Sequence, residues 1–158
     1  MARPVNAAGM ALIKSYETFR ACPYQDEGEV WTIGYGHTHA VNAETPPVSE
    51  PEACAILQAD LADFGNYVLL HIKVPLSDNE YAALVSLTEN VGTGPLVDTL
   101  GKKLNAGDRA GAADEFLRWD KEHIDGELVE IDGLARRRGE ERELFLTPDD
   151  EPASHNID

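Results

Sequence analysis

Two carboxylates and a hydroxyl lie close together in the N-terminal part of the sequence. Glu17 is followed by Asp26 and then by Thr32, within the segment YETFRACPYQDEGEVWTIGYGHTH. Hydrolysis of an acetal linkage needs a protonated acid at the leaving oxygen and a second, ionised carboxylate that directs water. Glu17 and Asp26 are residues of the type that this reaction needs, and the Thr32 hydroxyl could help Asp26 to hold the water.

The predicted surroundings of the two acids differ. Apolar residues recur at spacings of three and four over residues 6–20, which predicts an amphipathic helix. Glu17 lies at the margin of its apolar face, so we expect desolvation to raise the pKa of this carboxyl. Asp26 falls in a predicted turn over residues 25–28, where contact with water would keep it ionised. The pair would therefore differ in protonation at one pH.

A glycine-rich strand is predicted to follow, at about residues 29–37. With a period of two, Thr32, Gly34 and Gly36 share one face, which is nearly bare beyond Thr32. Such a face would let backbone approach a flat ligand such as a sugar ring and would form the floor of a cleft. The same glycines could instead only let the N-terminal helix lie close to the strand.

The remaining pattern is mostly helical and predicts the α+β class, with a cleft between two lobes. Ser49 and Pro51 begin a long helix, and the sequence SDNE at residues 77–80 is a capping box. Shorter helices are predicted at about residues 95–105, 108–120 and 133–146. The predicted organisation is an α+β lobe at 1–48 that carries the catalytic residues, a connecting helix at 49–72, a helical lobe at 73–146, and a disordered acidic tail at 147–158.

Charge and composition exclude several classes of function. The formal net charge is −16, from 29 acidic and 13 basic residues, so the surface repels nucleic acid and anionic lipid. No apolar run approaches the roughly 18 residues of a membrane span or forms a secretory signal. We therefore expect a soluble chain made in the cytoplasm, with Cys22 and Cys54 as reduced thiols. No metal or organic cofactor is expected, and His37 with His39 is a weak metal motif.

The residues ETFR and YQDEGEVWTIGYGH resemble the motif of the phage-type lysozymes, the endolysins of glycoside hydrolase family 24. The blocks ALVSLTENVGTGPL, LNAGDRAGAADEFLRW and GLARRRGEERELF are similar to the same family, in the same order. The resemblance implies a two-lobed lysozyme-like α+β fold and hydrolysis of the β-1,4 bond between N-acetylmuramic acid and N-acetylglucosamine in peptidoglycan. It implies that Glu17 is the general acid, and that Asp26 with Thr32 positions the attacking water, with inversion as the usual outcome.

Further residues are predicted to support the site or to bind substrate. The substrate-binding candidates are Gly34, Tyr35, Gly36, Asn90 and Gly92. Arg20 could orient substrate or close the first helix with a salt bridge, and His37 is expected to make a structural hydrogen bond. Gly92 could also be a helix C-cap. For Arg136, Arg137 and Arg138, ion pairing inside the fold is favoured over contact with peptidoglycan. Glu89 departs from the resemblance, because an apolar or aromatic side chain is usual there.

The sequence thus predicts a monomeric muramidase that binds a peptidoglycan glycan strand. By resemblance to endolysins, it would be made in a host cytoplasm without a signal peptide and released to the cell wall by another agent such as a holin. Two alternatives stay open. One is a lysozyme-fold binding protein that has lost turnover, and the other is a lytic transglycosylase, which needs the acid but no water-holding partner.

Overall fold

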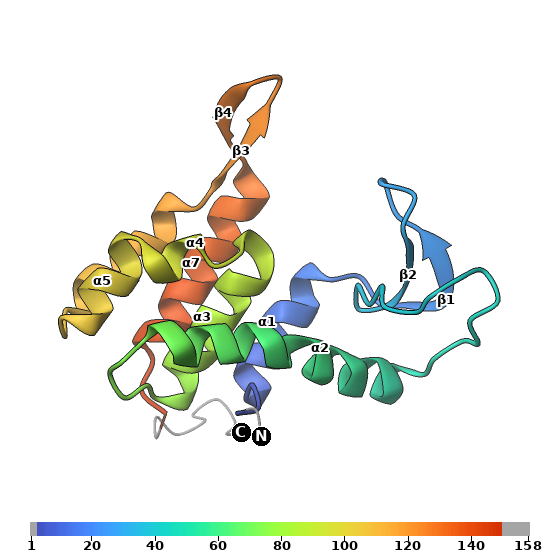
Figure 1. Cartoon of the computed structure of the whole chain (residues 1–158), viewed down its shortest axis with the longest axis horizontal. Coiled ribbons are helices and arrows are strands. Elements are labelled where there is room, and N and C mark those ends of the chain that lie inside the picture. The colour runs from blue at the N-terminus through green and yellow to red at the C-terminus, as the bar shows by residue number, and fades with distance from the viewer. Residues whose placement is uncertain (1–2, 150–158) are drawn as a thin grey trace, which may run out of the picture.

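The structure, a computed structural model, describes residues 3–149 and contains a small hairpin lobe and a larger helical lobe, with one long helix running between them (Figure 1). In chain order the elements are α1 (Ala7–Tyr16), β1 (Arg20–Gln25), β2 (Trp31–Gly34), α2 (Glu50–His71), α3 (Asp78–Val91), α4 (Gly94–Val97), α5 (Thr99–Asn105), α6 (Arg109–Glu115), the 3-10 turn η1 (Phe116–Arg118), β3 (Lys121–Ile124), β4 (Glu127–Glu130) and α7 (Asp132–Leu146).

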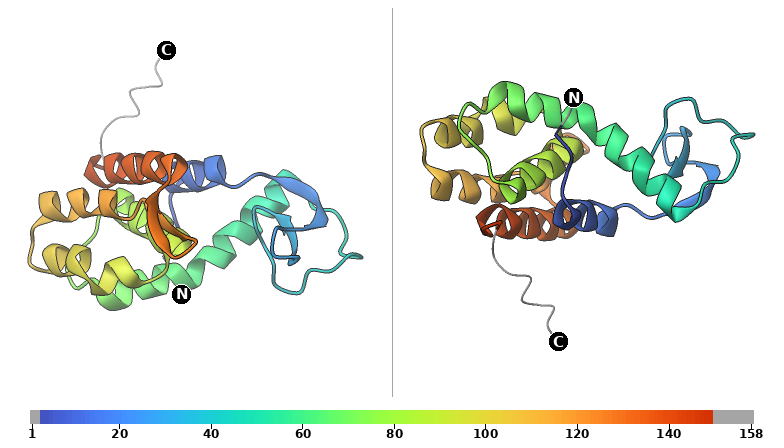
Figure 2. Two further views of the ribbon diagram at one scale, coloured as in Figure 1. Left: turned by 90° about the horizontal axis from the view of Figure 1, so that it is seen from above. Right: turned by 90° about the horizontal axis from the view of Figure 1, so that it is seen from below.

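Helix α1 is shorter than predicted and belongs to the helical lobe. Asn6 caps its first turn by accepting a hydrogen bond from the Gly9 amide (2.9 Å), and the chain becomes extended at Glu17. Residues beyond Glu17 leave the helix because Arg20 already pairs with β2. Met10 and Ile13 are part of the core shared with α3 and α7, and Figure 2 shows α1 beside α7. The predicted N-terminal lobe at 1–48 is therefore divided between the two lobes.

Strands β1 and β2 form the predicted hairpin, with Tyr24 opposite Thr32. The second strand ends earlier than predicted, because Gly34 and Gly36 have positive φ angles of 67° and 82°. Both glycines turn the chain, and Ile33 pairs with His37 across that turn. The expectation of a bare strand face over Gly34 and Gly36 is wrong, since this conformation, which glycine adopts at no steric cost, is incompatible with a continuing strand.

The long helix α2 confirms the predicted helix at 49–72. Ser49 and Glu52 form a capping box at its start, and its buried side includes Leu57 and Leu61. Its N-terminal half supports the hairpin lobe. Gly34 packs there, since a Cβ atom at that position would lie 3.2 Å from the Ala53 Cβ. Helix α2 is therefore the connection between the lobes, as the sequence indicates.

Helix α3 is the centre of the helical lobe and packs against α1, α2, α4 and α7. The predicted capping box is present, with Ser77 and Glu80 satisfying each other's backbone amides. Its consecutive residues Ala82, Ala83, Leu84 and Val85 have no exposed surface. A helix that is apolar all round must be enclosed by others, which explains the ring of short helices.

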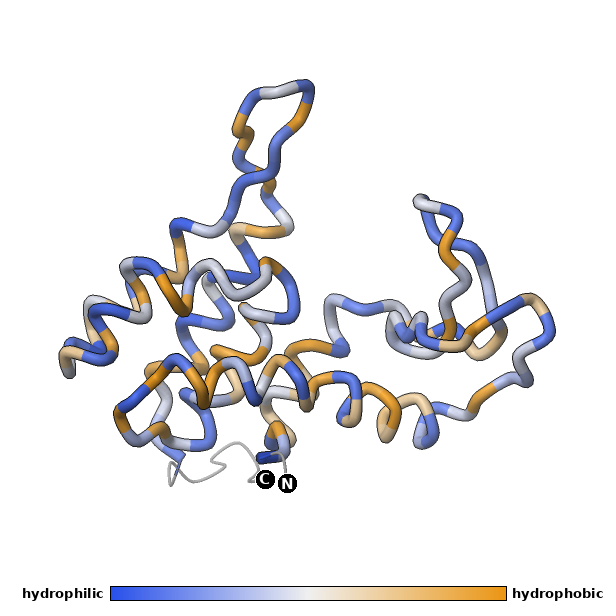
Figure 3. Tube along the Cα trace, viewed as in Figure 1, coloured by the Kyte–Doolittle hydropathy of each residue, from blue (hydrophilic) through white to orange (hydrophobic). Residues whose placement is uncertain are grey.

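Two features of the helical lobe differ from the prediction. The helix expected at 95–105 is divided at Asp98 into α4 and α5, which approach so closely that a Cβ on Gly101 would overlap the Leu96 carbonyl. Residues 121–130, for which no helix or strand was predicted, form the β3–β4 hairpin. Figure 3 shows a few separate hydrophobic patches along this mostly hydrophilic hairpin, and Ile124 and Leu128 are 45% and 59% exposed.

The predicted acidic tail begins later than residue 147. The Asp149 carboxylate accepts hydrogen bonds from the backbone amides of Asp78 (2.7 Å) and Asn79 (2.8 Å), which are free donors in the first turn of α3. Residues 147–149 therefore belong to the fold. The rest of the predicted tail lies outside the described residues.

Helices α2 and α3 pack closely at Gly65, because this residue has no side chain. A Cβ atom there would lie 2.0 Å from the hydroxyl oxygen of Tyr81. Tyr81 is only 1% exposed, and its hydroxyl donates a hydrogen bond to the Arg3 carbonyl (2.7 Å). We expect Gly65→Ala to lower the free energy of unfolding by about 1–3 kcal/mol, measured by urea denaturation. The matched control is Gly139→Ala in α7, where a Cβ meets no atom within 4 Å. This change is expected to raise stability by up to about 1 kcal/mol. Equal effects of the two changes would contradict this account.

Candidate active site

Glu17 lies where α1 ends and the chain turns toward the hairpin lobe. Its backbone amide donates to the Ile13 carbonyl (3.2 Å), but its own backbone is extended, so its half-buried side chain leaves the helix surface. A Cβ atom on Gly36 would lie 3.2 Å from Glu17 Oε2. Gly36 therefore leaves room for the carboxyl group, and of the predicted substrate-binding residues it is the one that lies against Glu17.

The surroundings of Glu17 favour its protonated form. Burial, followed by the charge of Glu89 and a hydrogen bond between the two carboxyl groups, raises the pKa of Glu17 to about 7, and the nearby Arg137 charge opposes this rise. The predicted direction of the shift is confirmed. Sequence analysis named only desolvation as its cause, whereas the structure adds a second carboxyl group as a neighbour.

Asp26 is held by the backbone of the turn between β1 and β2. Its Oδ1 accepts hydrogen bonds from the amides of Gly28 (2.8 Å) and Val30 (2.9 Å), and the residue is exposed to solvent. Thr32 is only 3% exposed, and its hydroxyl donates to the Val30 carbonyl (2.9 Å). The turn thus fixes the orientation of the Asp26 carboxylate, while the Thr32 hydroxyl keeps only its acceptor lone pairs for another partner.

Glu17 and Asp26 line the same open groove, of ≈ 630 Å³. Glu17 belongs to the end of α1 in the helical lobe, and Asp26 to the hairpin lobe. Thr32 lies outside this lining. The other residues that line the groove are Tyr16, Thr18, Tyr24, Glu27 and Gly28. The groove therefore brings together the two carboxyl groups predicted to do chemistry, one from each lobe.

Three of the other predicted residues have structural partners. The Tyr35 hydroxyl donates to Glu50 at the start of α2 (2.7 Å), and His37 Nδ1 lies 2.7 Å from Asp60 Oδ2 in the same helix. Arg20 is exposed and stacks on the Tyr24 ring, 4.1 Å from its centroid. The predicted salt bridge of Arg20 is not found, since no ion pair involves it within residues 3–149, and its role in orienting substrate stays a prediction.

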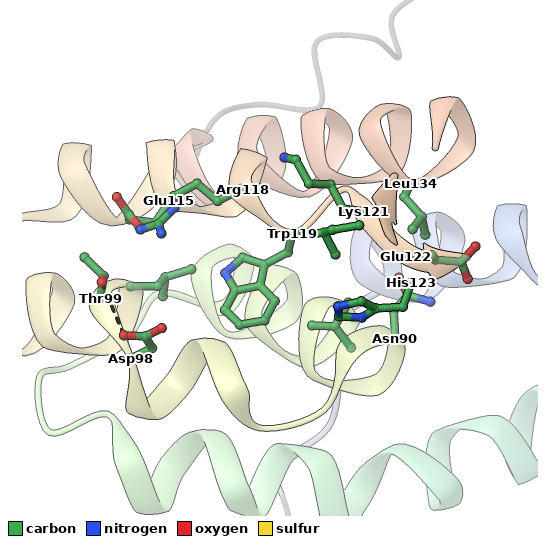
Figure 4. A pocket seen from close by; sticks show the side chains of 13 residues that line it. Asn90, Asp98, Thr99, Glu115, Arg118, Trp119, Lys121, Glu122, His123 and Leu134 are labelled. Atoms are coloured by element: carbon green, nitrogen blue, oxygen red, sulfur yellow. Dashed lines mark hydrogen bonds and ion pairs between the residues drawn. The ribbon is translucent and has the colours of Figure 1, made fainter. Parts of the chain in front are cut away.

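The remaining predicted binding residues are not part of the groove lining. Gly34 is buried on α2, and Gly92 has a φ of 86° and ends α3, which agrees with the helix C-cap interpretation. Asn90 lines a separate pocket of ≈ 490 Å³ beneath the β3–β4 hairpin, where Figure 4 shows it near His123 and Trp119. Its Oδ1 accepts a hydrogen bond from Arg138 (2.7 Å). The structure therefore does not bring these residues to the groove.

Two residues near Glu17 were not predicted as site residues. Arg137 is 4% exposed and forms ion pairs with Glu89 (2.9 Å) and Glu141 (3.1 Å), as expected for ion pairing inside the fold. Glu89 was recognised only as a departure from the family pattern. The sequence signal for both was present, since the densest basic cluster of an acidic chain needs acidic partners, but their meeting at Glu17 depends on the packing of α1, α3 and α7.

The groove has no metal-binding group among its described neighbours. Over residues 3–149, His, Cys, Asp and Glu nowhere form a group of three or more placed to hold a metal ion. Cys22 and Cys54 are both free thiols. Of the helices in this part of the chain, none combines the length and the apolar character needed to cross a membrane.

Comparison with known proteins gives consistent matches over nearly the whole chain. The profile of the family described as "Phage lysozyme" matches residues 14–141. The chain is 41% identical to the endolysin of Acyrthosiphon pisum secondary endosymbiont phage 1, over 89% of this chain and 97% of that protein. It is 40% identical to the endolysin of Bacillus phage B103, over 90% of this chain but only 54% of the relative.

Solved structures agree with this assignment. The muramidase domain of SpmX from Asticaccaulis excentricus superposes with a TM-score of 0.82 at 34% identity, covering 91% of this chain and 98% of that domain. The likeness includes both lobes and confirms the predicted lysozyme-like α+β fold. The chain belongs to the phage lysozyme family.

Proposed function

We propose that this chain hydrolyses the β-1,4 bond between N-acetylmuramic acid and N-acetylglucosamine, with Glu17 as general acid and Asp26 as the residue that directs water. Membership of the phage lysozyme family makes the chain a peptidoglycan-degrading glycoside hydrolase. The proposal adds the bond and the roles of the residues. The observation that carries it is that Glu17 and Asp26 line one groove in opposite environments.

The contrast between the two acids supports separate roles. Glu17 is half-buried next to a second carboxyl group, and its raised pKa of about 7 leaves a large protonated fraction near neutral pH. The Asp26 carboxylate instead accepts two backbone hydrogen bonds in a turn that is exposed to solvent. A proton donor and a negatively charged base on one groove are the pair that acetal hydrolysis requires.

The proposed reaction balances without any other group. The Glu17 proton moves to the glycosidic oxygen as the bond from that oxygen to the anomeric carbon breaks. A water molecule attacks the anomeric carbon from the opposite face and gives a proton to Asp26. Asp26 then releases this proton to solvent and Glu17 takes one up, so that one glycoside and one water give two sugar ends. Thr32 is nearly buried and lies outside the groove lining, so its role in holding the water stays a prediction.

The wider context is proposed by analogy with the relatives. Those named endolysin support action on the bacterial cell wall after release from the cell that makes the protein. Synthesis in the cytoplasm, release by a holin and a monomeric state stay predictions. The net charge of −16 would cause repulsion from an anionic wall, so we expect salt or divalent cations, which screen this repulsion, to increase activity.

Substitution of either acid tests the assigned roles. We expect Glu17→Gln and Asp26→Asn each to slow the clearing of purified peptidoglycan by roughly 10²–10⁴-fold, because each removes one partner of the acid–base pair. Glu44→Gln, which removes a charge from the exposed loop before α2, is the matched control and should clear at the wild-type rate. Clearing by Glu17→Gln as fast as by wild type would refute the role of Glu17.

The products distinguish hydrolysis from the transglycosylase alternative. A directed water should leave reducing N-acetylmuramic acid ends, each 18 Da heavier than the corresponding anhydro sugar, which mass spectrometry separates. Proton NMR during the first minutes should show the inverted anomer before mutarotation. Anhydro ends as the main product would contradict a water-directing role for Asp26, and a retained anomer would contradict inversion.

The raised pKa also predicts a pH-dependent difference in stability. Glu17 loses its proton near pH 4.5 as an ordinary glutamate in the unfolded chain and near pH 7 in the fold. Between these values the folded chain binds more protons, so the fold loses stability as pH rises, and the loss is complete above pH 7. Glu17→Gln avoids this loss. Its stability gain over wild type should therefore grow from pH 4.5 to pH 8 by on the order of 1–3 kcal/mol in urea denaturation. A gain that stays constant or shrinks would contradict the shift.

A further inference from the structure

We propose that Glu89 is a positioning residue for the reaction, which belongs with Arg137 to a cluster beside the Glu17 carboxyl group and keeps the catalytic proton on Glu17. The inference rests on the proposed role of Glu17 as general acid. It assigns a function to a residue where the family resemblance leads us to expect an apolar or aromatic side chain.

Glu89 and Asp26 line different pockets. Glu89 and Arg137 both act on the pKa of Glu17: the charge of Glu89 and a hydrogen bond to it favour the protonated form of Glu17, and the charge of Arg137 opposes it. Gly36, whose missing Cβ leaves room for Glu17 Oε2, lines a second pocket together with Glu89. Two carboxyl groups can form such a hydrogen bond only when one of them carries a proton, since two carboxylates would repel each other and offer no donor.

Arg137 determines which of the two acids takes the negative charge. Its Nη2 lies 2.9 Å from Glu89 Oε2, and the same nitrogen donates to the Ser86 carbonyl (3.2 Å) and hydroxyl (3.1 Å). Its Nε pairs with the fully buried Glu141 (3.1 Å). These contacts fix the guanidinium beside Glu89, so the charge of Glu89 has a partner and the proton of the pair remains on Glu17.

The ring of Tyr16 connects this cluster to the end of α1, where Glu17 lies. The Arg137 guanidinium carbon lies 5.4 Å from its centroid, and Tyr16 immediately precedes Glu17. Arg137 therefore contacts Glu89 through an ion pair and the end of α1 through the Tyr16 ring. Because Arg137 contacts both Glu89 and the end of α1, it holds the Glu89 and Glu17 carboxyl groups at a fixed distance from each other.

Other ionisable groups face the pair without contacting Glu17. On the Glu89 side they are His37, His39, Asp60 and Asp63, which line the same pocket, and on the groove side they are Asp26 and Glu27. His37 and Asp60 pair with each other (2.7 Å). Asp63 is exposed, so it offers a carboxylate of the same pocket whose removal leaves the Glu17–Glu89 hydrogen bond intact.

The role follows from what happens to the charges during turnover. When Glu17 has given its proton to the leaving oxygen, two carboxylates stand side by side with one arginine. Their repulsion favours the return of a proton from solvent to Glu17, which restores the acid for the next bond. A neutral side chain at position 89 would remove this repulsion, and Glu17 would then stay ionised at neutral pH.

The test compares Glu89→Gln with Asp63→Asn in the full chain. The glutamine oxygen can still accept from Arg137, while its amide can donate to an ionised Glu17. We expect the ¹³C carboxyl signal of Glu17, identified by its loss in Glu17→Gln, to titrate near pH 7 in wild type. In Glu89→Gln this midpoint should fall by about one pH unit or more, with a single transition instead of a coupled pair, and in Asp63→Asn it should stay in place.

A parallel measurement follows kcat/KM for peptidoglycan against pH at constant ionic strength. The loss of activity at high pH should move downward by the same amount in Glu89→Gln, because the acid is then ionised earlier. A midpoint that falls by less than about half a pH unit, or equally in Asp63→Asn, would overturn the proposal. The NMR titration needs no turnover, so a shifted midpoint without activity in wild type would disprove the proposed function and leave the assignment of Glu89 intact.

Discussion

The contact of Glu17, Glu89 and Arg137 is the interaction on which the site depends. Each residue comes from a different helix, namely the end of α1, α3 and α7, so the contact exists only when these helices are packed together. Carboxyl groups held this close cannot both be ionised at little cost, and the buried arginine decides where the charge resides. The protonation state of the acid is therefore a property of the packed helical lobe rather than of the motif around Glu17.

The second acid depends on a different part of the fold. Asp26 is oriented by the backbone amides of its own turn, and the hairpin lobe that carries the turn is attached to α2 by specific contacts. Tyr35 reaches Glu50, His37 reaches Asp60, and Gly34 lies against Ala53. The groove is thus bounded by one acid from each lobe, and α2 connects the two supports. This explains why residues expected to touch substrate instead hold the hairpin lobe in place.

Local sequence patterns were sufficient to predict the features that depend on interactions between residues close in sequence. Ser49 with Pro51, and the capping box that begins at Ser77, identified the starts of α2 and α3, and the spacing of Glu17 and Asp26 identified the two acids that share the groove. The desolvation of Glu17 also followed from its place beside apolar residues.

The errors concern features that depend on tertiary contact. Gly34 and Gly36 were expected to extend a strand, but positive φ angles and the approach of Ala53 and Glu17 make them a turn. The β3–β4 hairpin was missed because both strands are exposed, so their residues carry no period-two pattern of apolar side chains. The meeting of Glu89 with Glu17 could not be predicted either, because residues far apart in sequence come together only through helix packing.

A crystal structure of Glu17→Gln with a bound peptidoglycan oligosaccharide tests the central claim most directly, since this change keeps the shape of the acid while preventing proton transfer. The account predicts a glycosidic oxygen at about 3 Å from the side chain of residue 17, with Asp26 and a water on the opposite face of the adjoining sugar ring. A glycan seated elsewhere, such as in the pocket beneath the β3–β4 hairpin, or one with Asp26 on the same face as residue 17, would contradict it.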